Sequence, residues 1–167
     1  MNKNQIQKEW AKYPTGKIGG GEFCGECGRY NVRNSTCTMI GVRGKKVLMI
    51  LRANDPQKGF WAFPGGYLDW NETVEECAVR EFREESGFEV KSKGLLGVYS
   101  SPKRDLDGRQ NVDYCFYGEV GEKVGENDDE VERVKWFELN RLPDKIAFDH
   151  REMIGDYINS QSRNDRS

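Results

Sequence analysis

The chain has 167 residues, a length that fits one folded domain with a substantial core. Its 26 basic and 28 acidic residues are mixed along the sequence and give a net charge of −2, so no broad basic face predicts binding to nucleic acid or to a membrane surface. No apolar run approaches the ~20 residues of a membrane span, and the start MNKNQIQKEW lacks the apolar core of a secretory signal. We therefore expect a cytoplasmic protein with one catalytic domain.

Residues 1–34 are polar and rich in glycine, without a helical or strand period, and are predicted to form an arm or a small cysteine-containing knuckle. Cys24 and Cys27 have the CxxC spacing of metal and redox sites. Cys37 offers a third thiolate, but no second CxxC follows, and a tetrahedral zinc site needs four ligands. Free cysteines or a remnant half-site are therefore favoured over Zn²⁺ at Cys24 and Cys27. The odd number of five cysteines also argues against a disulfide framework.

Apolar, β-branched runs predict four strands next in the chain. Residues 36–42 and 45–51 are separated by a short Arg-Gly turn, which indicates a hairpin. Residues 61–63 and 67–70 flank a Pro-Gly-Gly segment and are predicted to be two further short strands. The folded domain is therefore expected to begin at residue 35.

A helix of roughly residues 72–86 is predicted to follow. Asn71 or Thr73 can cap its start, and Thr73 and Glu76 have the spacing of a capping box. Gly87 stands where a left-handed residue ends a helix. Local signals thus define both ends of this helix.

The second half of the chain contains three more strand-like runs and one more helix-like segment, at residues 94–100, 111–120, 131–139 and 147–158. Mixed strands with two helices predict an α/β sandwich. We expect the folded domain to span residues 35–160 and residues 161–167 to be a disordered tail.

The acidic residues of the predicted central helix do not all face solvent. Projected at about 100° per residue, Glu81 and Glu85 fall inside the apolar arc of the helix, and Glu84 lies on its rim. Arg80, one turn before Glu84, can pair with it, which leaves Glu81 and Glu85 without a partner. Burying an unpaired carboxylate costs several kcal/mol, so a cation is expected to compensate these acids.

Carboxylate oxygens clustered without matching basic residues suit Mg²⁺ or Mn²⁺, which bind through carboxylates, waters and substrate phosphate oxygens. Ca²⁺ is a weaker alternative, because the sequence has no EF-hand loop pattern. A salt-bridged helix face without metal is the remaining alternative. The glycines of Pro64-Gly65-Gly66 allow the backbone to pass close to this site, where a free carbonyl could be a ligand.

A spaced motif runs from Gly66 to Phe88: Gly66, five residues, Glu72, seven residues, and then Arg80-Glu81-Phe82-Arg83-Glu84-Glu85-Ser86-Gly87-Phe88. This motif resembles a complete Nudix box, and the resemblance covers about residues 35–159. It implies an αβα sandwich around a mixed β-sheet, in which the box forms a loop and helix that bind divalent metal and a diphosphate. The implied reaction is hydrolysis of a nucleoside diphosphate linked to another group.

The resemblance assigns roles to residues of the box by position. The implied metal ligands are the carbonyl of Gly65, Glu81, Glu84 and Glu85. Glu84 is also a catalytic candidate that would orient the attacking water. Arg80 and Glu72 would position the site, and Gly66 would contact the substrate. Which carboxylate acts as the general base varies within the family.

A further acidic residue from a later loop often completes sites of this family. The loop before the last predicted strand offers Glu126, Asp128, Asp129 and Glu130. Glu130, six residues before Trp136, is the preferred candidate for an additional catalytic carboxylate. The alternative is a solvated acidic loop with no role in the site.

Three segments outside the box resemble the ADP-ribose pyrophosphatase branch of the family, at residues 51–66, 97–109 and 147–154. Pro102, which follows the box by about fifteen residues, and Arg104 are expected to contact the substrate. These features favour ADP-ribose or an ADP-sugar, cleaved to AMP and a sugar phosphate. For Pro102 the alternative is a turn that ends a strand.

Other substrates, such as NADH or an oxidised dNTP, stay open, and so does a non-catalytic domain that senses ADP-ribose for a regulator. Sensors of that kind often lose box carboxylates, all of which are present here. His150 is expected to be a packing or surface residue rather than a catalytic one. The expected partner is a small nucleotide diphosphate, and a homodimer is expected by analogy with the ADP-ribose branch.

Overall fold

The computed structural model describes residues 23–24, 29–30, 33–105 and 109–164. Seven strands form the main sheet: β3 (Ser35–Arg43), β4 (Lys46–Arg52), β5 (Trp61–Ala62), β6 (Gly65–Tyr67), β7 (Phe88–Tyr99), β8 (Val112–Lys123) and β9 (Val131–Glu138). The strand order is β5-β4-β3-β8-β7, while β6 pairs with β3 and β9 pairs with β4. The β3–β8 pair is parallel and the other pairs are antiparallel, so the sheet is mixed.

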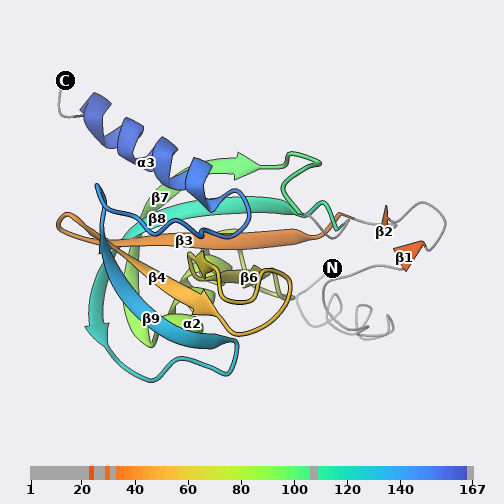
Figure 1. The fold of residues 1–167 in the computed structure, drawn as a ribbon, viewed down its shortest axis with the longest axis horizontal. Helices are drawn as coiled ribbons and strands as arrows, with labels where there is room; N and C mark the ends of the chain where they lie inside the picture. Colours follow the sequence, from red (N-terminus) through yellow and green to blue (C-terminus); the bar gives the residue numbers. More distant parts are fainter. Residues whose placement is uncertain (1–22, 25–28, 31–32, 106–108, 165–167) are drawn as a thin grey trace, which may run out of the picture.

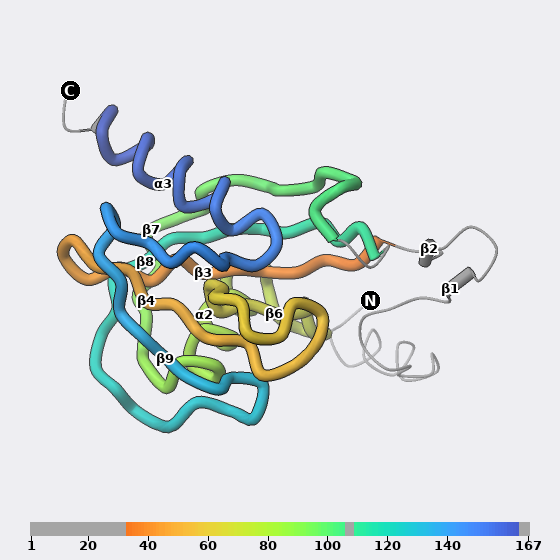
Figure 2. The backbone as a smooth tube through the Cα atoms, viewed as in Figure 1, coloured from red at the N-terminus to blue at the C-terminus, as the bar shows by residue number. Residues whose placement is uncertain are grey.

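The two described helices, α2 (Val74–Ser86) and α3 (His150–Asn164), cover opposite faces of the sheet (Figure 1 and Figure 2). Alternate residues of a strand face opposite sides, and β3 uses both sides to build the core. Met39 is fully buried in one core cluster with Phe82 of α2. Ile40, the next residue, is buried in a second cluster with Met153 of α3. The predicted α/β class and αβα sandwich are confirmed.

Helix α2 begins and ends where the local signals predict. The Thr73 hydroxyl accepts from the Glu76 N–H at 3.2 Å, and the Glu76 carboxylate accepts from the Thr73 N–H at 2.7 Å, which completes the capping box. Gly87 adopts a left-handed conformation with φ 75°, and its N–H donates to the Arg83 carbonyl. These caps fix which residues of α2 face the sheet.

Two strands differ from the prediction. The strand expected at residues 67–70 lies earlier, at Gly65–Tyr67, because this segment pairs with β3 and places Gly65 opposite Thr38. β7 begins at Phe88, directly after the helix, because its pairing with β8 extends through a polar first half that no apolar run marks. In both cases the partner strand, rather than local hydrophobicity, decides where the strand begins.

The N-terminal segment contains a two-stranded antiparallel pair, β1 (Phe23–Cys24) and β2 (Arg29–Tyr30). Cys27 lies outside the described residues. Cys37 is fully buried in the main core, where its thiol contacts that of Cys77. Cys37 is a free, buried cysteine whose side chain faces α2, so it is not available as a third zinc thiolate. Among the residues that the structure describes, no group of three or more Cys, His, Asp or Glu side chains could hold a zinc ion.

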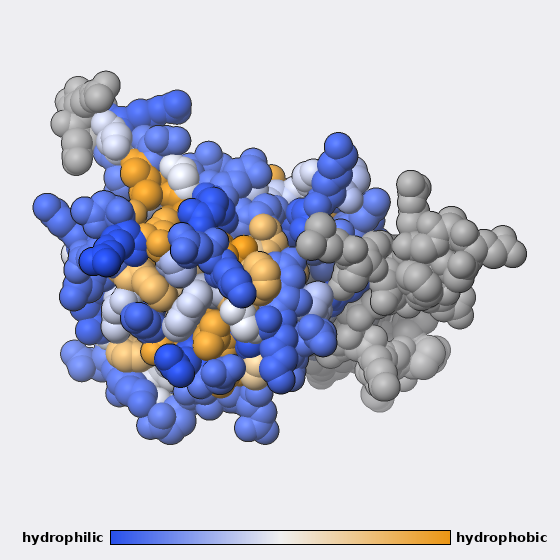
Figure 3. All heavy atoms as spheres, in the orientation of Figure 1, coloured by the Kyte–Doolittle hydropathy of each residue, from blue (hydrophilic) through white to orange (hydrophobic). Residues whose placement is uncertain are grey.

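Helix α3 continues to Asn164, so it includes the first residues of the segment expected to be a tail. No helix in the described part of the chain has both the length and the apolar character needed to cross a bilayer. Polar and charged side chains cover most of the face shown in Figure 3, with apolar side chains gathered in its middle.

Candidate active site

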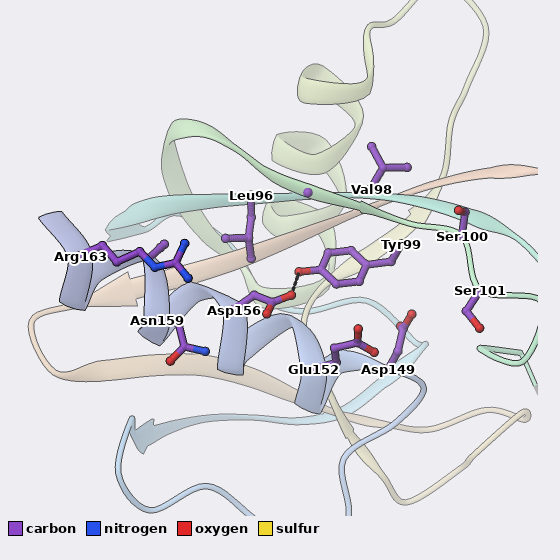
Figure 4. Close-up of a pocket in the computed structure, with 12 residues that line it drawn as sticks. Leu96, Val98, Tyr99, Ser100, Ser101, Asp149, Glu152, Asp156, Asn159 and Arg163 are labelled. Atoms are coloured by element: carbon purple, nitrogen blue, oxygen red, sulfur yellow. Dashed lines mark hydrogen bonds between the residues drawn. The ribbon is translucent and has the colours of Figure 1, made fainter.

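A cavity of about 320 Å³, which we call the box cavity, lies where β3, β6 and β8 meet the loop after β4 and the start of α3. Glu85, Gly65 and Gly66 of the box line it, together with Glu130. Larger hollows lie along α2 and between β7 and α3. Figure 4 shows the hollow between β7 and α3, where the Tyr99 hydroxyl donates a hydrogen bond to the Asp156 carboxylate at 2.9 Å. The box cavity is therefore distinguished by its chemistry rather than by its size.

Glu85 is the most deeply buried of the box carboxylates, with 4% of its surface exposed. Within the described chain, Gly65 supplies its hydrogen bond, through a backbone N–H at 2.8 Å. Burial raises the pKa of Glu85 well above the ordinary carboxyl value, and the charges of Glu81, Asp128 and Glu130 raise this pKa further. Removing water from an acid surrounded by other acids is unfavourable unless a cation balances the charge.

Glu81 lies one turn before Glu85 on the same face of α2, and its carboxylate approaches the backbone of β6. A Cβ atom on Gly66 would lie 2.5 Å from the Glu81 carboxyl, closer than such atoms can approach. This contact explains why the box motif has a glycine at this position. Burial raises the pKa of Glu81, while a hydrogen bond from Arg80 opposes this effect.

Arg80 joins several acids of the box. Its guanidinium donates to both carboxylate oxygens of Glu72, at 2.7 and 2.9 Å, to Glu81 at 2.8 Å and to Glu84 at 3.1 Å. The hydrogen bond from Arg80 lowers the pKa of Glu72 to about 2. Glu72 therefore holds the Arg80 guanidinium through two hydrogen bonds.

The Arg80 contacts correct one expectation. The helix projection paired Arg80 with Glu84 and left Glu81 without a partner. The pair with Glu84 is present, but Arg80 also bonds the adjacent Glu81. A projection of Cα positions cannot show how far a long arginine side chain bends along the helix surface.

The remaining acidic candidates lie at different depths. The Glu84 side chain is 52% exposed and does not line the box cavity, in agreement with its predicted position on the rim of the helix. Glu130 does line the cavity, and its charge acts on both Glu81 and Glu85. Glu126 instead forms an exposed ion pair with Lys123. Of Glu84, Glu126, Asp128, Asp129 and Glu130, only Glu130 is among the residues that line the box cavity.

The two substrate-binding candidates outside the box are placed differently. Arg104 is buried in the cavity wall, where its guanidinium donates to both oxygens of Asp149, at 2.9 and 3.0 Å. Pro102 is exposed and is not among the residues that line the cavity. The position of Pro102 fits the alternative of a turn after the strand.

Sequence reasoning missed several cavity residues because they come from separate elements. They are Thr36 and Thr38 of β3, Arg52 at the end of β4, Asn111 just before β8, Asp113 of β8, and Phe148 before α3. Arg52 lies over the Phe148 ring at 5.1 Å. The polar pair in NVDYCFY, at alternate positions of an otherwise apolar strand, was the available signal for Asn111 and Asp113.

Comparison with known proteins agrees with this geometry. The model of the NUDIX domain matches residues 32–157. The chain belongs to the Nudix hydrolase family. This Nudix hydrolase is 46% identical over 116 residues to an ADP-ribose pyrophosphatase of Methanocaldococcus jannaschii, a match that covers 70% of this chain and 68% of the relative.

Two further relatives show the range of the family. A putative 8-oxo-dGTP diphosphatase of Bacillus subtilis is 31% identical over 116 residues, which are 69% of this chain and 72% of that protein. The crystal structure of a MutT NUDIX hydrolase from Burkholderia pseudomallei superposes with a TM-score of 0.68 and 28% identity, over 75% of this chain and 98% of that one. This chain is accordingly a hydrolase that acts on diphosphate bonds.

Nudix hydrolases typically use a divalent metal, and the donor set of this one fits such an ion. In the conformation described for residues 33–105 and 109–164, no three acidic, thiol or imidazole groups form a ready-made metal cage. Arg80 instead holds Glu72, Glu81 and Glu84. Arg52 is a described cation whose charge acts on Glu85, but it acts on Glu130 as well, and the pKa of Glu85 is still raised well above its ordinary value. Hard carboxylate oxygens in such a site suit Mg²⁺ or Mn²⁺.

Replacing Glu85 with glutamine tests this charge imbalance. We expect Glu85→Gln to raise the melting temperature in EDTA, because the amide keeps the shape and the Gly65 hydrogen bond but removes a buried charge. The increase in melting temperature that Mg²⁺ gives the unmodified protein should shrink or disappear. Glu122→Gln, at an exposed position, is the matched control and should behave as the unmodified protein. A destabilised Glu85→Gln with a full Mg²⁺ effect would contradict the interpretation.

His150, the only histidine of the chain, is buried at the cavity wall, as its predicted packing role requires. Its Nδ1 accepts the Phe63 N–H at 2.9 Å, and its ring stacks on Phe63 at 5.5 Å. Burial lowers the pKa of His150 from 6.5 to about 3. The imidazole is therefore neutral in the folded protein at every ordinary working pH.

This pKa shift predicts a pH dependence of stability. Below pH 6.5 the unfolded chain binds a proton that folded His150 does not accept until about pH 3, so stability falls as the pH decreases through this range. Between pH 7 and pH 5 the loss from this group is about 2 kcal/mol. His150→Asn keeps an acceptor without a titrating group, and denaturant unfolding should show a smaller loss for it. Parallel pH profiles for the two proteins would contradict a buried neutral histidine.

Proposed function

We propose that this Nudix hydrolase cleaves ADP-ribose or a related ADP-sugar to AMP and a sugar phosphate, with a divalent metal ion. The observation that carries the proposal is the 46% identity to the archaeal ADP-ribose pyrophosphatase. That match extends over 116 residues and therefore far beyond the box, in a family whose substrate is set outside the box. The complete set of box carboxylates supports hydrolysis rather than sensing.

The proposed metal ligands are Glu81, Glu85 and the carbonyl of Gly65, with Glu84 at the rim as a further candidate. A divalent ion held by these residues would supply positive charge to the diphosphate and to the leaving oxygen, and would make a bound water more acidic. Glu72 fixes Arg80 through two hydrogen bonds, and Arg80 in turn orients the Glu81 carboxylate. This chain of contacts sets the position of a ligand before substrate arrives.

A carboxylate must accept the proton of the attacking water. Both Glu130 and Glu84 are exposed, but Glu130 lines the cavity and its charge acts on Glu81 and Glu85, whereas Glu84 is not among the cavity-lining residues. We therefore assign the general base to Glu130, with Glu84 as the alternative. In the reaction, the water oxygen bonds to one phosphorus and the bond from that phosphorus to the bridging oxygen breaks. With ADP-ribose the products are AMP and ribose 5-phosphate.

A panel of substrates tests this proposal. Phosphate-coupled hydrolysis of ADP-ribose, ADP-glucose, NADH, diadenosine polyphosphates and 8-oxo-dGTP should give the highest kcat/KM with ADP-ribose, and EDTA should abolish it. Glu81→Gln and Glu130→Gln should lose several orders of magnitude in kcat while remaining folded. Glu122→Gln should retain full activity.

Each other outcome has a defined meaning. A higher kcat/KM for 8-oxo-dGTP, the substrate in the name of the Bacillus subtilis relative, would contradict the ADP-ribose proposal and leave the box chemistry standing. If the protein hydrolyses no compound in the panel but binds ADP-ribose tightly, the alternative of a non-catalytic ADP-ribose-sensing domain would be favoured. Full activity of Glu81→Gln would contradict the assignment of the metal site.

A further inference from the structure

The box cavity contains two buried acceptors that the proposed chemistry does not use. Asp113 is 1% exposed and Asn111 is 5% exposed, and both line the cavity. Asp113 Oδ2 and Asn111 Oδ1 have no hydrogen-bond partner in the described part of the chain. Buried polar atoms without partners are uncommon in folded proteins and are costly. Here two of them line one cavity.

The geometry of the strand places these acceptors together. Asn111 directly precedes β8 and Asp113 is the second residue of β8. Residues two positions apart in an extended segment face the same side, and both of these line the same cavity. Asp113 is held in place from β3, since its Oδ1 accepts from the hydroxyls of Thr36 at 2.6 Å and Thr38 at 3.1 Å. Only Oδ2 is left for a ligand.

Arg104 is a cation whose charge acts on Asp113. Burial raises the pKa of Asp113, and the charge of Arg104 and the hydrogen bonds from Thr36 and Thr38 oppose this rise. Arg104 itself is committed to Asp149 and is buried, so it balances charge from a fixed position. The Asp113 side chain is thus held from β3, and its Oδ2 is a buried polar atom of the cavity lining without a described partner.

A carboxylate and an amide carbonyl repel phosphate, so the part of a substrate that meets them carries hydrogen-bond donors. A nucleotide has such donors in the amino group of its base and in its ribose hydroxyls. The same cavity has an aromatic wall, Phe63, Phe148 and His150, on the side where α3 begins. Apolar and aromatic walls with a few placed polar groups are typical of sites for nucleosides.

We propose that Asp113 and Asn111 form an acceptor subsite that binds the donor groups of the substrate's nucleoside. This inference rests on the proposed function for the identity of the nucleoside, and it makes Asp113 a specificity-determining residue. Loss of a donor from the ligand would leave buried acceptors unpaired, which discriminates strongly between otherwise similar ligands.

Binding of nucleoside monophosphates tests the subsite without any dependence on hydrolysis. Calorimetry with Mg²⁺ would compare AMP, IMP and 2′-deoxy-AMP on the unmodified protein and on Asp113→Asn. The variant keeps an oxygen for Thr36 and Thr38 but presents an N–H to the cavity, so AMP binding should weaken about 10-fold to 100-fold. Ser92→Ala removes another buried, unpartnered oxygen outside this cavity and should leave binding unchanged.

The ligand panel identifies the donor. If the amino group of the base is the partner, Asp113→Asn lowers the affinity for AMP but not for IMP, because IMP has a carbonyl in place of the amino group. If the 2′-hydroxyl of the ribose is the partner, Asp113→Asn lowers the affinity for AMP but not for 2′-deoxy-AMP. If all three ligands are weakened equally, 3′-deoxy-AMP tests the remaining hydroxyl and should escape the loss of affinity. Equal weakening of 3′-deoxy-AMP as well, or no weakening of any ligand, would overturn the proposal. Asn111→Ala provides a second variant should Asp113→Asn fail to fold, and the same criteria apply to it.

This experiment separates the subsite from the proposed function. If the protein binds AMP through Asp113 but does not hydrolyse ADP-ribose, the subsite is supported and the proposed enzymatic function is contradicted. If the unmodified protein hydrolyses ADP-ribose and Asp113→Asn has the same substrate specificity, the proposed function is supported and the subsite is contradicted.

Discussion

The carboxylate of Glu85 is buried between α2 and β6, where the Gly65 N–H donates to it at 2.8 Å. This hydrogen bond ties the helix to the glycine turn ahead of it and sets the distance between them. Gly66 can then lie against the Glu81 carboxyl, a contact that leaves no space for a Cβ atom. The metal-binding chemistry proposed here depends on this one buried acid, because its charge needs compensation that the described chain does not fully supply.

The rest of the box distributes charge around that acid. Arg80 is anchored by Glu72 and reaches both Glu81 and Glu84, so one basic group is shared among three acids. Glu130 adds a further negative charge from the loop before β9. A site arranged in this way attracts a divalent cation, and the cation in turn attracts the diphosphate of a substrate. A bound cation would therefore allow a protein of net charge −2 to bind a negatively charged substrate.

Local signals were sufficient for α2, because Thr73, Glu76 and Gly87 act within a few residues of the helix ends. The helical period was also sufficient to show that Glu81 and Glu85 face inward. The sequence could not show that Arg80 bonds Glu81 or that Cys37 faces the core. Nor could it show the walls of the cavity, because Asp113 meets Thr36 only through the parallel pairing of β3 with β8, across 77 positions of the chain. Local propensity and periodicity contain no information on such pairing.

The most direct test of the charge argument is anomalous diffraction from crystals grown with Mn²⁺. We expect a peak in coordination contact with carboxylate oxygens of Glu81 and Glu85, with the Gly65 carbonyl as a further ligand. Manganese bound only at surface acids, with Glu85 still holding no contact beyond the Gly65 N–H, would contradict it.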